Sequence, residues 1–133
     1  MLSAEHLEGN LARFTGTENW TRHALARNMV MTDGVLYLRE HADCHWLIDA
    51  IASYVGYSPE LKGEHFQVWT FERTGDQVAD GSKPHLLYAT DGNDNRIATQ
   101  EIGFSDFPLP KIVLWAVFDG GFDAFVLMLP SEY

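Results

Sequence analysis

The sequence has little of three features that would point to a particular class of protein. Its single cysteine, Cys44, allows no internal disulfide, which fits a reducing cytoplasm. No apolar run reaches the roughly 18 residues that a membrane-spanning helix requires. The first residues, MLSAEHLEGN, include acids and no basic stretch, unlike a signal peptide. We therefore expect a cytoplasmic protein without membrane contact.

Basic residues are also scarce. Nine Lys and Arg stand against nineteen Asp and Glu, so the formal net charge is −10. Such a chain has few cations to neutralise phosphates, which argues against direct binding to nucleic acid. An acidic surface suits a basic protein partner, including one that itself binds DNA. The simpler interpretation is that the charge keeps the protein soluble.

Familiar catalytic motifs are missing from the sequence. There is no G-x-S-x-G, no Walker A motif and no G-x-G-x-x-G. The sequence therefore names no reaction and no cofactor. Its hydrophobic content of 46% over 133 residues predicts one globular domain, residues 1–133.

Residues 44–55, CHWLIDAIASYV, carry the clearest local pattern. We predict a central helix here, with Asp43 as its N-cap and Gly56 just past its end. Its large apolar residues recur at helical spacing: Trp46, Leu47, Ala50, Ile51, Tyr54 and Val55. Two further helices are predicted, over Ser3–Phe14 and over Val35–His41 with Asp33 as the cap. Residues 18–31 fit either a short hairpin or a helix, and their alternation favours strands.

From residue 66 the apolar spacing changes to a period of two, which is typical of strands. The predicted fold is α+β, with residues 1–65 mainly helical and 66–133 mainly an antiparallel sheet covered on one face by helices. The sheet is predicted to be a meander of five or more strands. The five are Phe66–Arg73, Leu86–Ala89, Arg96–Ile102, Ile112–Phe118 and Ala124–Leu129.

Several side chains are candidates for chemistry, each with a plainer interpretation. His41 and His45 have a spacing that suits a metal, but a helix start at Asp43 would separate them. Cys44 near a helix N-terminus is a candidate nucleophile, although a lone cysteine is usually a small apolar residue. His23 with Asp33 is a candidate base and its orienting partner. The loop at Asp91 copies the start of a calcium loop and then departs from it, which favours a hairpin turn.

Two sets of residues are candidates for binding a protein. Aromatic residues on the uncovered sheet face are typical of interface hot spots. They are Trp69, Phe71 and Trp115. Loop aspartates in the more acidic C-terminal part are the second set, and we expect them to form an acidic patch. They are Asp76, Asp80, Asp91, Asp94, Asp119 and Asp123.

Seven blocks of sequence are similar to a known family. They are FTGTENWTRH (14–23), TDGVLYL (32–38), WLIDAIASY (46–54), FQVW (66–69), DGN (91–93), TQEIGFSDFPLP (99–110) and LPSEY (129–133). The chain resembles a family of small bacterial proteins, described only as a domain of unknown function and common on plasmids, phages and integrated elements. The resemblance implies a mobile-element setting and brings no known reaction. Cys44-His45 and the GGFDAF stretch (120–125) depart from the family pattern.

We therefore expect a non-enzymatic binding protein that acts on a host or defence protein. The resemblance and the charge suggest an anti-restriction or anti-CRISPR type, or a DNA mimic. A self-associating domain, with a homodimer formed through the sheet, is the first alternative. A small metal-dependent or cysteine enzyme that uses His23, Asp33, His41, Cys44 or His45 is the second.

Overall fold

The structure is a computed structural model that describes residues 3–61, 63–74, 83–105 and 107–133. Its helices there are α1 (Ala4–Leu11), α2 (Asp33–His41) and α3 (His45–Tyr57), with two short 3-10 helices, η1 (Pro59–Leu61) and η2 (Pro130–Glu132). Its strands are β1 (Thr21–Arg22), β2 (Met29–Met31), β3 (Phe66–Arg73), β4 (Lys83–Thr90), β5 (Arg96–Ser105), β6 (Lys111–Asp119) and β7 (Ala124–Met128). The α+β class is confirmed, and so is the hairpin in residues 18–31.

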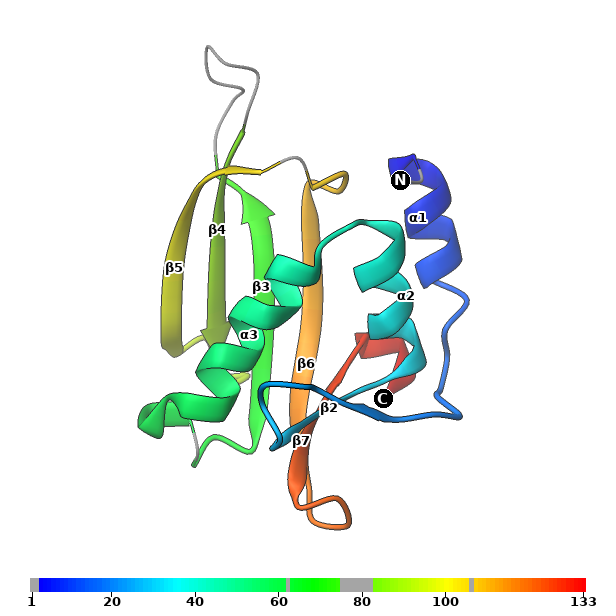
Figure 1. Ribbon diagram of the computed structural model, residues 1–133. Coiled ribbons are helices and arrows are strands. Elements are labelled where there is room, and N and C mark those ends of the chain that lie inside the picture. Colours follow the sequence, from blue (N-terminus) through cyan, green and yellow to red (C-terminus); the bar gives the residue numbers. More distant parts are fainter. Residues whose placement is uncertain (1–2, 62, 75–82, 106) are drawn as a thin grey trace.

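The strands form one mixed sheet with the order β1-β2-β7-β6-β3-β4-β5 (Figure 1). The prediction was an antiparallel meander of five or more strands, with five strands named, and it was wrong about the direction and the order of the strands. The described residues form seven strands, and β2 pairs with β7 in parallel. Strand β6 also lies beside β3 rather than beside β5, so the chain returns across the sheet between β5 and β6.

Both errors have a physical cause. Strand β2 is only three residues long and all three are buried, so its sequence can indicate a strand but not the strand that pairs with it. Its partner β7 is nearly a hundred positions away, with Met29 opposite Phe125. The period of a sequence reports local conformation, whereas the order of strands is set by contacts between distant segments.

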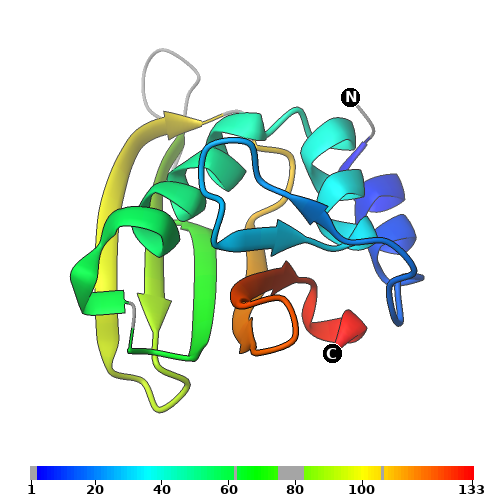
Figure 2. The ribbon, with the colours of Figure 1, turned by 60° about the horizontal axis from the view of Figure 1, so that its bottom comes forward.

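The helices lie on one face of the sheet. Helix α3 crosses this face, α2 lies beside α3, and α1 lies beside α2 on the side away from α3 (Figures 1 and 2). Trp46 of α3 meets Phe71 of β3 with ring centroids 5.3 Å apart, and Tyr54 meets Trp69 at 5.4 Å. The apolar stripe of α3 therefore covers the middle of the sheet, as its helical spacing predicted.

The helix starts differ from the predicted ones by one residue. Cys44, not Asp43, is the N-cap of α3, and Asp43 instead has a left-handed backbone with φ of 50°. Asp43 thus makes the sharp turn between α2 and α3, a conformation that Asp tolerates better than most residues. Thr32, not Asp33, caps α2 by accepting a hydrogen bond from the N–H of Val35. Gly56 lies inside α3, which runs on to Tyr57.

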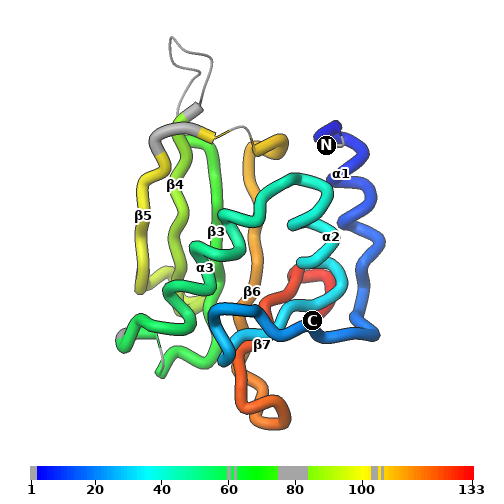
Figure 3. The backbone as a smooth tube through the Cα atoms, in the orientation of Figure 1, coloured from blue at the N-terminus to red at the C-terminus, as the bar shows by residue number. Residues whose placement is uncertain are grey.

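The C-terminal turn lies beside α2 (Figure 3). The buried carboxylate of Glu132 holds it against the start of that helix. Oε1 of Glu132 accepts hydrogen bonds from Thr32 Oγ1 at 2.6 Å and from the N–H of Leu129 at 2.9 Å. Its Oε2 accepts from the N–H of Gly34 at 3.0 Å. A negative charge at a helix N-terminus is favourable, so this contact stabilises the C-terminal turn. Because Tyr133 follows Glu132 directly, the contact also fixes the position of Tyr133.

Candidate protein-binding surfaces

The face of the sheet opposite the helices carries an aromatic cluster. Side chains alternate across a strand, so Phe66 and Trp115 point away from the helix-covered side. Their rings are 5.1 Å apart, and Tyr133 packs against Trp115 at 5.4 Å and against Phe66 at 6.4 Å. Tyr133 is 75% exposed, and the other two rings are partly exposed. We call Phe66, Trp115 and Tyr133 the aromatic trio.

Apolar side chains surround the aromatic trio on the same face. Strand alternation places neighbours from β3, β4 and β6 there, and all of them are partly exposed: Val68, Leu86, Tyr88, Val113 and Val117. Toward the β7–β2 side of the sheet, the side chains on this face are not exposed, because Val30, Ala124 and Val126 are buried. The partly exposed apolar area therefore lies over β4, β3 and β6.

The structure places only one of the three predicted surface aromatics on the uncovered face. Trp69 and Phe71 are each 1% exposed and lie beneath α3. The prediction that they lie on the uncovered face was therefore wrong. They occupy odd positions of β3, whereas Phe66 and Val68 occupy even ones. Trp69 also donates its indole N–H to Gln67 Oε1, so its polar atom is satisfied inside the core. Trp115 lies on the uncovered face.

Four of the predicted acidic residues lie in two turns at the same end of the sheet. Asp91 and Asp94 are in the β4–β5 turn, and Asp119 and Asp123 are at the β6–β7 turn. The strand register places both turns at the end of β3 where Phe66 lies. Asp76 and Asp80 lie outside the described residues.

Each of these four aspartates has a local role in its turn. Asp91 accepts hydrogen bonds from Asn95 Nδ2 and from the N–H of Asn93, and these contacts lower its pKa. Asp119 accepts from the N–H of Gly121. Asp94 and Asp123 have φ values of 67° and 53°, a left-handed conformation in which Asp is enriched. Turn geometry alone therefore accounts for the acids at these positions.

His23 is buried, and both of its ring nitrogens are engaged. Its Nδ1 accepts from the N–H groups of Leu25 and Ala26, each at 3.1 Å. The proton must then be on Nε2, which lies 2.8 Å from Asp49 Oδ1 and donates to it. The partner of His23 is thus Asp49, not Asp33 as the sequence suggested. This imidazole organises a loop and joins it to α3, and no lone pair remains to accept a substrate proton.

Asp33 belongs to a different contact. Its Oδ2 accepts from the N–H groups of Glu18 and Asn19 at 3.0 and 3.3 Å, while its own N–H donates to Thr17 Oγ1. The hydrogen bond from Glu18 is the largest cause that holds the pKa of Asp33 below its ordinary value. Asp33 therefore ties the segment after α1 to the start of α2.

Cys44 is fully buried and is a poor nucleophile. Burial raises the pKa of its thiol to about 12, which overturns the expectation that the helix start would activate it. His41 stacks on Tyr37 in α2, with centroids 4.0 Å apart, and His45 lies 3.6 Å from Glu40. Within the described ranges, no group of three or more His, Cys, Asp or Glu side chains is placed to hold a metal ion.

Comparison with known proteins identifies the family. The model of a family of unknown function, DUF6876, matches residues 5–133. The chain is a member of DUF6876. No curated protein and no solved structure matches it. DUF6876 membership brings no reaction or partner, and none of the helices in the described part of this chain is long and apolar enough to cross a membrane.

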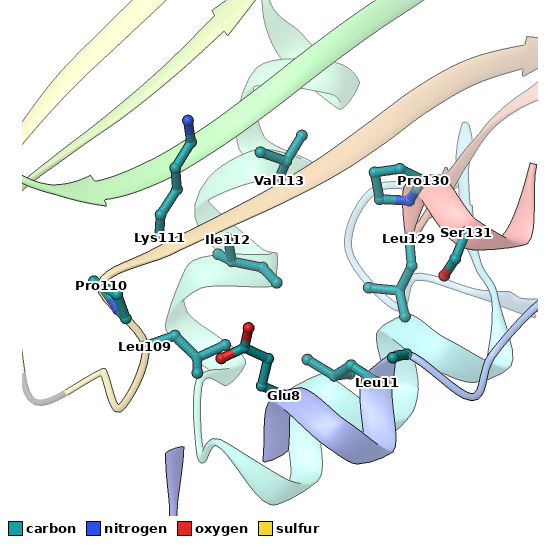
Figure 4. A pocket seen from close by; sticks show the side chains of 11 residues that line it. Glu8, Leu11, Leu109, Pro110, Lys111, Ile112, Val113, Leu129, Pro130 and Ser131 are labelled. Carbon is teal, nitrogen blue, oxygen red and sulfur yellow. The ribbon is translucent and has the colours of Figure 1, made fainter. Parts of the chain in front are cut away.

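A cleft of about 560 Å³ lies at a second place on this DUF6876 chain, between α1, β6 and the C-terminal turn (Figure 4). Its walls are mostly apolar, with Leu11, Leu109, Ile112 and Leu129 directed toward it. The Glu8 side chain also points toward the cleft, whereas Lys111 extends away from it. This volume is within the range of about 300–1,000 Å³ that is usual for ligand sites.

Sequence reasoning missed most of these surface residues. The aromatic trio combines β3, β6 and the chain end, and only tertiary contacts bring them together. The sequence did contain one indication of which face is covered. Phe66 and Val68 lie at even-numbered positions of β3 and so share one face, and Trp69 and Phe71 lie at odd-numbered positions and share the other. Trp46 and Tyr54 in the central helix need large or aromatic partners. The face with Trp69 and Phe71 was therefore the better candidate for the covered face. The cleft left no such signal.

Proposed function

We propose that this chain is a protein-binding domain without a reaction of its own, and that it docks a partner on the uncovered sheet face around the aromatic trio. The observation that carries the proposal is the trio itself. Three packed aromatic rings, one of them 75% exposed, lie on a sheet face that no helix in the described part of the chain covers. Tyr and Trp are enriched at binding hot spots because each joins a large apolar area to a polar group.

The electrostatics favour a basic partner. The chain has a net charge of −10, and the two acidic turns lie at the end of the sheet where Phe66 begins β3. Acids at the rim of an apolar surface steer an oppositely charged protein toward it and discourage other partners. An apolar centre with a charged rim is also the usual anatomy of a protein interface.

The finer part of the proposal concerns the identity of the partner. The sequence resemblance to mobile-element proteins, together with the acidic surface, favours a host or defence protein that binds nucleic acid. An anti-restriction or anti-CRISPR protein would act in this way, and so would a DNA mimic. A mimic depends mainly on charge, so its binding would weaken as salt increases, whereas binding through the trio would not.

The buried state of the candidate nucleophile supports a role other than catalysis. Cys44 has a raised pKa and no exposed surface, and His23 uses both ring nitrogens in structural hydrogen bonds. Self-association through the same face is the second candidate function. The exposed trio supports it, because a homodimer would bury the same apolar surface.

The experiment is an affinity pull-down from nuclease-treated host lysate at low and moderate salt, read by mass spectrometry. Three baits are compared: the unchanged chain, a Trp115→Ser/Tyr133→Ser double variant, and Leu25→Ser. Leu25 is 70% exposed and lies in the loop before β2, so its variant is a matched control for loss of an exposed apolar side chain.

We expect a basic partner that the unchanged chain and Leu25→Ser both retain and that the double variant loses. A partner retained equally by all three baits would remove the sheet face from the proposal, and absence of any enriched partner would remove the binding function. Light scattering on the same samples addresses self-association: a dimer that the double variant converts to monomer would favour the second candidate.

A further inference from the structure

Strand β6 extends beyond its partner β7. The register between them ends where Trp115 faces Met128, whereas β6 begins at Lys111. After Met128 the chain turns into η2, and Pro130 has no N–H that could continue the ladder. Residues 111–114 are therefore paired with β3 on one side and, among the described residues, with no strand on the other.

The alternation of hydrogen bonds between β3 and β6 shows which backbone groups of β6 point away from β3, toward its free edge. The N–H of Arg73 donates to the carbonyl of Pro110 at 2.9 Å, and the N–H of Phe118 donates to that of His65 at 2.8 Å. Antiparallel bonding alternates, so even-numbered residues of β6 bond to β3. Lys111 and Val113 consequently direct their N–H and C=O groups toward the free edge.

This edge forms one side of the cleft described above. Lys111, Ile112 and Val113 line the cleft, and α1 and the C-terminal turn form its other walls. Outer edges of sheets are usually protected by polar or charged side chains. Strand β5 follows that rule with exposed Thr99, Gln100 and Glu101. The free part of β6 follows it only at its first residue, the exposed Lys111; beyond Lys111 it faces an apolar cleft.

The charges beside the cleft indicate what kind of chain would enter it. Glu8 and Lys111 both line the cleft and are exposed, but only the Glu8 side chain points toward it, whereas Lys111 extends away. An entering chain therefore meets the Glu8 carboxylate, on a protein with a net charge of −10. A basic side chain would be attracted there. A second copy of this chain would bring the same negative charge, and a folded domain would meet the walls made by α1 and η2 before it reached the edge. An extended peptide meets neither obstacle.

We propose that the cleft binds an extended, basic peptide segment of a partner protein, which adds as a strand to β6 along residues 111–114. Its backbone pairs with Lys111 and Val113, an apolar side chain enters the cleft near Leu11 and Leu109, and a Lys or Arg reaches Glu8. The free edge is about 13 Å long at about 3.3 Å per residue, which suits a segment of four or five residues. Strand addition of this kind combines backbone affinity with side-chain selectivity.

This inference rests on the proposed protein-binding function but uses a different surface from the aromatic trio. The test is backbone amide NMR of the full chain with a panel of capped pentapeptides in which Lys alternates with Val, Ile or Thr. Glu-for-Lys versions of the same peptides and versions with N-methylated backbones serve as probes of charge and of backbone pairing.

We expect the lysine peptides to slow hydrogen exchange of the Lys111 and Val113 amides, while those of Ile112 and Trp115, already paired, keep their rates. Glu8→Gln should weaken binding by about two- to fivefold, as expected for an exposed ion pair. Glu5→Gln, the same change on α1 outside the cleft, should leave binding unchanged. Methylation on the peptide edge that faces β6 should abolish binding, and methylation on the other edge should not.

Three outcomes would overturn the proposal. One is a panel that causes no shifts at millimolar peptide. Another is binding that leaves the Lys111 and Val113 amides unchanged, which would place the peptide on another surface. The third is protection of these amides without peptide that grows with protein concentration, which would identify a second copy as the occupant. The Trp115→Ser/Tyr133→Ser variant separates the two surfaces, since it should keep peptide binding whether or not the trio binds a partner.

Discussion

The two faces of strand β3 differ although their residues alternate along eight positions of one chain. Gln67, Trp69 and Phe71 are almost completely buried beneath the helices, at 0%, 1% and 1% exposure. Phe66 and Val68, on the other face, remain partly exposed. The covered face thus stabilises the fold, while the uncovered face keeps apolar area that a second molecule can bury.

The covered side also contains polar contacts that hold the segment between η1 and β3. Gln67 donates its amide to the carbonyls of Leu61 and Glu64 and accepts from the Trp69 indole. Buried groups that are fully paired in this way are costly to disturb, because a substitution leaves their partners without hydrogen bonds. We therefore expect substitutions on the covered side to act on stability, and those on the uncovered side to act on binding.

The largest expected effect on stability comes from replacing one tryptophan on each face with alanine and comparing the two variants. Trp69→Ala should lower the free energy of unfolding by about 3–5 kcal/mol, because it opens a cavity under α3 and leaves Gln67 without its donor. Trp115→Ala should cost about half as much or less, since its ring is partly exposed in the folded state. Urea denaturation measures both. Equal losses would show that the uncovered face is packed as tightly as the covered one.

The next effect concerns the carboxylate that holds the C-terminal turn. Glu132→Ala leaves three donors unpaired, on Thr32, Gly34 and Leu129, and should cost about 3 kcal/mol. Gly34→Ala tests the same contact from the other side, because an added Cβ would lie 2.6 Å from Glu132 Oε1. Both are measured by urea denaturation. A loss below that of Trp115→Ala for both variants would contradict a structural role for this carboxylate.

A smaller effect separates the two partners of the His23–Asp49 contact. His23→Ala leaves the buried N–H of Ala26 and the part-buried N–H of Leu25 unpaired and should cost about 2 kcal/mol. Asp49→Asn should cost about 0.5 kcal/mol, because the Asp49 side chain is 55% exposed and its contact is screened by water. Thermal unfolding of the two variants gives the comparison. Equal losses would mean that the hydrogen bond from His23 to Asp49, not the contact with the backbone N–H groups, holds this loop.

The smallest effect is a pH dependence. The pKa of Asp33 is below its ordinary value in the folded protein, so its carboxylate adds stability above the unfolded pKa. That contribution is lost as the pH falls through the folded pKa, below about 4, where the carboxylate is protonated. Asp33→Asn should therefore lose less stability than the unchanged chain between pH 6 and pH 3. Urea midpoints measured across this range decide it, and parallel curves would contradict the prediction.

The sequence was sufficient for local structure and insufficient for the arrangement of distant parts. The period of apolar residues located α3 and most of the strands, because burial of one face sets that period. It did not place β6 beside β3 or β2 beside β7, since these pairings depend on contacts between remote segments. Of the three predicted surface aromatics, Trp115 lies on the uncovered face, whereas Trp69 and Phe71 lie on the covered one, and Tyr133 was not among the candidates. The alternation of residues along a strand shows which residues share a face, but it does not show which of the two faces is covered.

The parallel pair β2–β7 has a consequence for how the protein is made in the cell. Met29 pairs with Phe125, so one of the earliest strands to leave the ribosome needs a partner from one of the last. Until then Met29, Val30 and Met31, all buried in the finished fold, lack β7, and only the short strand β1 can pair with them. Closing so long a loop is entropically costly and slows folding. Nascent chains stalled before residue 124 should therefore be the species most dependent on chaperones.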